Sequence, residues 1–217
     1  MTVTRNLTKT LLMPCVVLGT LYGSPAASAA TGSHVAATAK GPAAKQRMLR
    51  RGMNVVGFNA AIARAHGYKI VTYANGDQQS VPITPGSHLP KSPILRHDRG
   101  LHPDANSDYN KVIGNCGTSW IAVMQTGPSQ VQVASGFGVN SSPAVGYSWT
   151  VTLTDANGTS QQSASGALFL RTSWGRSWNN LNQHGFTHDF VSSGLADLED
   201  GTICYAGRPD VSIGGLA

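Results

Sequence analysis

The cysteines are the residues of this chain with the clearest covalent chemistry. Cys116 and Cys204 are the two thiols that remain once the N-terminal segment containing Cys15 is set aside. In an oxidising compartment two such thiols pair by default. Closing the long loop between them stabilises a fold by roughly 4 kcal/mol. We therefore predict one structural disulfide, Cys116–Cys204.

Two short segments around these residues carry a possible nucleophile. Residues 114–120 resemble the nucleophile segment of papain-like cysteine proteases, and residues 172–178 are similar to that family's later Asn-Ser-Trp-Gly segment. The chain departs from the family at Thr172, which stands where the family has the asparagine that orients the base. It also has no histidine between Cys116 and His184, where the family places the base. Because a thiol without a base is a poor nucleophile, we assign no catalytic residue.

Two groups of side chains could ligate a metal ion. Asp104, Asn106 and Asp108 alternate like the oxygen ligands of a calcium loop, but the turn glycine and final glutamate of an EF-hand are missing. His184 and His188 are four residues apart and share one face of a helix or a strand. Polar loops and surface histidines explain both groups as well as a metal does. We keep the five residues as candidate ligands and expect no cofactor.

Four aromatic residues are candidates for ligand binding. Tyr147 and Trp149 share one face of a predicted strand, and Trp174 and Trp178 share one face if their segment is extended. Rows of aromatic rings on an exported sheet can stack on sugar rings. In a small sandwich, tryptophans also fill the core. Solvent exposure of the rings distinguishes these two interpretations.

The elements that must position these side chains are mostly strands. Residues 145–153 alternate large with small or polar side chains, which is the period of a half-buried strand. Similar runs, separated by turn residues, recur beyond Tyr109. We predict an antiparallel β-sandwich, or a small barrel, of about six strands. The expected strands are 117–125, 130–139, 145–155, 166–174, 184–192 and 202–213.

The N-terminal half has a different organisation. Arg5 and Lys9 precede an apolar run and then small residues, which is the pattern of a secretory signal peptide. Asn59 is a predicted helix cap within a short helical range, 48–65. Asn75–Gly76 predicts a hairpin turn. The expected segments are a signal peptide (1–30), a disordered basic segment (31–47), a helix plus β-hairpin appendage (48–83), a Pro-rich linker (84–103) and the disulfide-linked sandwich (104–217).

Charge and composition limit the function classes. Residues 31–100 contain ten Lys and Arg against two Asp, whereas acids outnumber bases over 101–217. An exported basic segment favours an anionic envelope polymer over nucleic acid, although a solvated tail explains it too. The excess of Arg over Lys fits a bacterial source. We expect no membrane span, and the oligomeric state stays open.

Three function classes remain. The first is a secreted, extracellular protein that acts by binding or surface interaction, with cell wall or polysaccharide as its ligand and without catalysis. The second is a secreted hydrolase whose His and Asp residues come from separate segments. The third is a purely structural extracellular protein. No phosphate loop, dinucleotide fingerprint or serine-hydrolase elbow adds a fourth class.

Overall fold

The computed structural model describes residues 46–97 and 114–217. The expected signal peptide, nearly all of the expected basic segment and the calcium-like residues Asp104, Asn106 and Asp108 lie outside these ranges. The described part is mainly β-structure, as the sequence predicts. No helix within it is long and apolar enough to cross a membrane.

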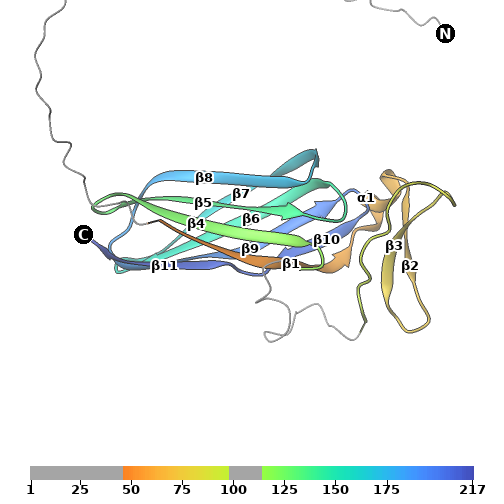
Figure 1. Ribbon diagram of the computed structural model, residues 1–217, viewed down its shortest axis with the longest axis horizontal. Helices are drawn as coiled ribbons and strands as arrows, with labels where there is room; N and C mark the ends of the chain where they lie inside the picture. The colour runs from red at the N-terminus through yellow and green to blue at the C-terminus, as the bar shows by residue number, and fades with distance from the viewer. Residues whose placement is uncertain (1–45, 98–113) are drawn as a thin grey trace, which may run out of the picture. The chain divides into compact units, whose positions relative to one another are not determined.

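Nine strands form one antiparallel sheet. The hydrogen-bonded order is β7-β6-β9-β10-β1-β4-β5-β8, with β11 paired to β9 (Figure 1). There are more strands than expected, because the 202–213 run divides into two strands, the 166–174 run is divided at Thr172, and residues 46–58 form a further strand. The strands are β1 (Gln46–Phe58), β4 (Gly117–Gly127), β5 (Gln130–Val139), β6 (Ala144–Asp155), β7 (Gly158–Arg171), β8 (Ser173–Asn182), β9 (Gly185–Leu198), β10 (Thr202–Ala206) and β11 (Asp210–Leu216).

The two ends of this order form a seam. β7 and β8 are consecutive in the chain and only Thr172 separates them, yet β7 pairs with β6 and β8 pairs with β5. The sheet therefore curls until its terminal strands are joined by a turn while neither pairs with the other. The result is a sandwich that is nearly closed into a barrel.

The core lies between the inner faces of the curled sheet. Trp149 on β6 is fully buried, and its Nε1 donates to Ser135 Oγ on β5 at 2.9 Å. That hydroxyl donates in turn to the Trp120 carbonyl oxygen at 2.7 Å. The Phe137 and Trp149 rings lie 5.5 Å apart. Aliphatic side chains with no exposed surface complete the core: Ile121, Val123, Val131, Val133, Val151, Val191 and Leu198.

The helix expected over 48–65 is much shorter. Only α1 (Ala60–Ala65) is helical, and the Asn59 side chain accepts the N–H groups of Ala61 and Ile62 as the predicted cap. Residues 46–58 form β1 instead, pairing with β10 at one end and β4 at the other. Glycines in this range disfavour a helix, and two partner strands favour extension. The sheet thus contains strands from both sides of the Pro-rich range.

A second, two-stranded sheet follows α1. β2 (Tyr68–Thr72) and β3 (Gln78–Pro82) form the hairpin that Asn75–Gly76 predicts. Ser80 Oγ donates to the Asp200 carbonyl, and the Asn59 N–H donates to the Gly201 carbonyl at 2.7 Å, so the hairpin and α1 are bonded to the β9–β10 turn. Part of the expected linker also runs beside β3, where Leu95 and Gln78 exchange backbone hydrogen bonds.

The predicted disulfide is confirmed. Cys116 and Cys204 are bonded, with Cα atoms 5.9 Å apart and a sequence separation of 88. Both are fully buried, and Cys204 pairs with Val55 on β1. The Cys116 N–H donates to the Met53 carbonyl, also on β1. The bridge therefore joins the start of β4 to β10 across β1.

Replacing both cysteines by serine tests the contribution of this bridge. We expect the Cys116→Ser/Cys204→Ser variant to lose about 2–5 kcal/mol of unfolding free energy, because its unfolded chain is no longer cross-linked. Urea unfolding of the wild type with and without reductant provides the control. Reductant should lower the wild-type midpoint and leave that of the variant unchanged. Equal midpoints for oxidised and reduced wild type would contradict the prediction.

Candidate functional site: an aromatic cleft at the β7–β8 seam

A bulge near the end of β7 forms one side of the site. Gly146 on β6 pairs with Ala167, and Ala144 pairs with Arg171, so three residues of β7 oppose a single residue of β6. The extra length pushes 168–170 away from the ladder. Phe169 is consequently 90% exposed, and Leu170 has a left-handed φ of 52°. Such a conformation is costly for leucine and is typical of functional or strained sites.

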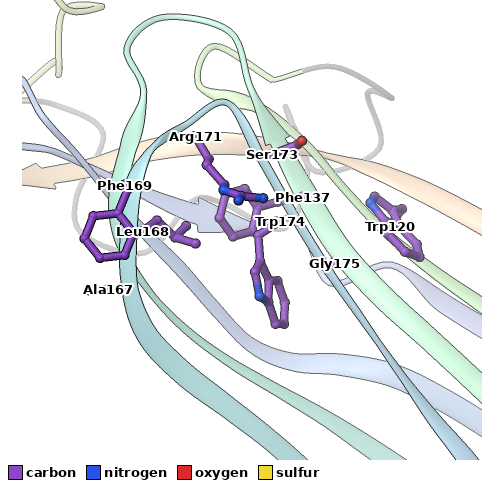
Figure 2. A pocket seen from close by; sticks show the side chains of 9 residues that line it. All are labelled: Trp120, Phe137, Ala167, Leu168, Phe169, Arg171, Ser173, Trp174 and Gly175. Carbon is purple, nitrogen blue, oxygen red and sulfur yellow. The ribbon is translucent and has the colours of Figure 1, made fainter. Parts of the chain in front are cut away.

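A cleft of about 590 Å³ opens between this bulge and the first residues of β8. Figure 2 shows Leu168 and Phe169 on one side and Trp120 on the opposite side, with Phe137 and Trp174 between them. The volume is in the range of small-molecule sites. The full lining is Trp120, Phe137, Ala167, Leu168, Phe169, Arg171, Ser173, Trp174 and Gly175.

Trp174 is the central aromatic residue of the cleft. Its ring lies 4.3 Å from the Tyr147 ring and 5.8 Å from the Trp149 ring, and it is only partly buried. No described strand covers Trp174 at the seam. One side of its ring therefore packs against the core, and the other side lines the cleft. Of the other predicted ligand residues, Tyr147 supports this ring, whereas Trp149 and Trp178 are buried in the core.

Trp120 is a cleft residue that the sequence analysis missed. It lies on the outer face of β4, where it pairs in register with Gly136 on β5, and Gly136 pairs in turn with Gly175 on β8. A Cβ added to either glycine would come within 3.0 Å of the Trp120 ring. The indole therefore lies directly on two glycine backbones. A signal was available, because glycine inside a strand marks a close approach.

The polar groups of the cleft are cationic or neutral. Arg171 and Ser173 are exposed beside the rings. Arg176 follows on β8, with its guanidinium 5.6 Å from the Trp178 ring centre. The sequence from Gly158 to His188 contains no acidic residue. The cleft therefore suits a neutral or anionic ligand.

The predicted histidine ligands do not converge on a metal site. His184 Nδ1 lies 2.7 Å from the Ala217 carbonyl oxygen, whereas His188 Nε2 lies 3.6 Å from Asp210 Oδ2. Within 46–97 and 114–217, no three His, Cys, Asp or Glu side chains gather in a group that could hold a metal ion.

His188 also bears on the hydrolase alternative. Ser212 is opposite His188 in register, and the Asp210 carboxylate contacts the His188 ring. The three residue types of a catalytic triad are therefore neighbours on β9 and β11. His188 and Asp210 are each 46% exposed. A triad needs a buried carboxylate that fixes the imidazole and a serine bonded to its other nitrogen. The exposed contact between His188 and Asp210 departs from that geometry.

Asp189 is the buried acid of this region. It has no exposed surface, and its Oδ1 accepts a hydrogen bond from Gln183 Nε2 at 2.7 Å, whereas Oδ2 has no partner. Burial raises the pKa of Asp189 to about 6, against the opposing effect of the Gln183 hydrogen bond. The folded protein therefore holds a proton that the unfolded chain releases near pH 4.

This raised pKa predicts that stability falls as pH rises from about 4 to about 6, because the folded state binds more protons there. Above pH 6 the ionised carboxylate costs at most about 3 kcal/mol. Asp189→Asn should remove this decline, since the amide is neutral throughout. Urea unfolding at pH 4.5 and 7.5 measures the change in unfolding free energy, with Asp210→Asn as a control at an exposed carboxylate. Identical pH dependence in wild type and Asp189→Asn would contradict the prediction.

Comparison with known proteins finds no relative of this chain. No protein-family model, no curated protein and no solved structure matches the chain.

Proposed function

We propose that this protein is an exported, non-catalytic binding protein that holds a polysaccharide of the cell envelope in the cleft at the β7–β8 seam. The observation that carries the proposal is that two partly exposed indoles, Trp120 and Trp174, line the same cleft. The expected export supports an extracellular ligand. The buried disulfide fits the same compartment.

The chemistry of the cleft suits sugar rings. The C–H faces of a sugar stack on aromatic rings, and its hydroxyl groups need hydrogen-bonding partners around those rings. Trp174 and Trp120 provide ring surface, and Arg171 and Ser173 provide polar groups beside it. Phe169 is 90% exposed at the bulge that lines the cleft, so it offers a further ring surface to a bound chain.

The charge distribution favours a polymer that is neutral or anionic. Arg171 lines the cleft, and Arg176 is exposed on the same strand. Arg47 and Arg50 on β1 are also exposed. Binding that depends on these cations should weaken as salt shortens the Debye length from about 10 Å at 0.1 M to about 3 Å at 1 M. Stacking on the indoles should persist at high salt.

Binding to purified envelope polysaccharides tests the proposal. We expect Trp120→Ala and Phe169→Ala each to raise the dissociation constant about tenfold, the equivalent of about 1.4 kcal/mol of lost stacking. Both side chains lie outside the core, so the fold is retained. Phe186→Ala is the matched control, because Phe186 is 66% exposed and does not line the cleft.

Tryptophan fluorescence and calorimetric titration measure the affinities. The proposal predicts wild-type affinity for Phe186→Ala and, for anionic polymers only, a weaker salt dependence of binding in Arg171→Ala. It is overturned if no envelope polysaccharide binds, or if Phe186→Ala weakens binding as much as Phe169→Ala does. A wild-type affinity for Trp120→Ala would remove the cleft from the binding site.

A further inference from the structure

The free edge of β7 differs from every other strand edge in the described part of the chain. From Gly158 to Ala167 the strand pairs with β6 without any register shift, and this stretch contains no charged residue and no proline. It is about 30 Å long at about 3.3 Å per residue. Its other edge is not paired with any strand that the structure describes.

The other edges carry features that discourage further pairing. β8 has Arg176 and a register shift beside Asn180, whose φ is 56°. The part of β1 that pairs with β4 alone carries three arginines. β11 has Asp210 and a register shift of its own. In the small sheet, β2 has Lys69 and β3 ends at Pro82. Charges, prolines and bulges are the means by which proteins block edge-to-edge association.

We infer that β7 is an interaction surface for a second copy of this chain, paired antiparallel through Gly158–Ala167 about a two-fold axis. A strand that meets its own copy is matched in length and pattern, and a two-fold interface needs only such self-complementarity. Because the stretch is uncharged, no like charges meet in any antiparallel register. A charged partner strand would gain no ion pair here.

The side chains along this edge support close pairing. Ser163 bonds to Thr150 on β6 at 3.0 Å, and Gln161 Nε2 lies 3.4 Å from the Thr152 hydroxyl. Thr159 and Thr154 continue the same row of hydroxyl groups. Small hydroxyl and amide side chains allow cross-strand hydrogen bonds when a further strand is added. In a dimer, this row of hydroxyl and amide side chains would continue from β7 of one copy onto β7 of the other.

Ala167 is the one residue of the paired stretch that lines the cleft, and the bulge lies beyond that stretch, so this pairing leaves the cleft accessible. A dimer therefore presents two clefts to one polymer. Two linked sites hold a repeating ligand more tightly than one site does. The inference does not depend on the identity of that ligand.

Two lysine substitutions distinguish an interface at the β7 edge from an interface on the face of the sheet. Ser163→Lys places a cation on the free edge, and Thr150→Lys places one directly opposite it on β6. Both substitutions remove the same hydroxyl hydrogen bond, so their effects on folding are matched. Thermal unfolding of both variants checks this match.

Sedimentation equilibrium of the purified protein from about 1 μM to about 1 mM measures the association. We expect a reversible wild-type dimer, a dissociation constant raised at least about tenfold by Ser163→Lys, and a wild-type constant for Thr150→Lys. A wild type that stays monomeric throughout the range overturns the inference. So does an equal loss of dimer in both variants, which would place the interface on the sheet face rather than on the β7 edge.

Discussion

A single residue, Thr172, joins two strands that pair with different neighbours, and this constraint shapes the rest of the molecule. β7 must stay on β6 and β8 must stay on β5, so the sheet curls but does not close. The open seam exposes one side of Trp174 and creates the cleft. It also leaves β7 with a free edge. The candidate binding site and the candidate dimer surface thus have one structural origin.

The residues around the seam serve stability and recognition together. Trp174 contacts Tyr147, Phe137 and Trp149, so its ring completes the core where a cover strand is missing. Trp120 lies on two glycines, and a side chain at either position would displace it. The cleft is therefore held by packed rings on strands rather than by a loop, which gives a preformed surface with little conformational freedom to lose on binding. A substitution at Trp174 would therefore alter the core and the cleft together.

Local features were predictable from the sequence, and long-range pairings were not. The alternation of β6, the Asn59 cap, the Asn75–Gly76 hairpin and the disulfide each depend on a few neighbouring residues or on compartment chemistry, and all four are present. The sequence predicts a helix where β1 forms, because the partners of β1 are about 70 and 150 residues away in the chain. Trp120 was missed because its role depends on glycines in two other strands. Tertiary pairing, not propensity, decides such positions.

The position of β1 has a consequence for how the chain folds. β1 pairs with β4 and, through Met53–Phe58, with β10 close to the C-terminus. Ribosomes complete the N-terminal strand long before its last partner exists, so the sheet cannot be assembled during synthesis. Topologies with such distant contacts fold slowly, because a large loop must close before the contacts form. The disulfide is subject to the same delay, because Cys116 and Cys204 come together only once β10 has paired with β1, so oxidation of the two thiols is one of the last steps of folding.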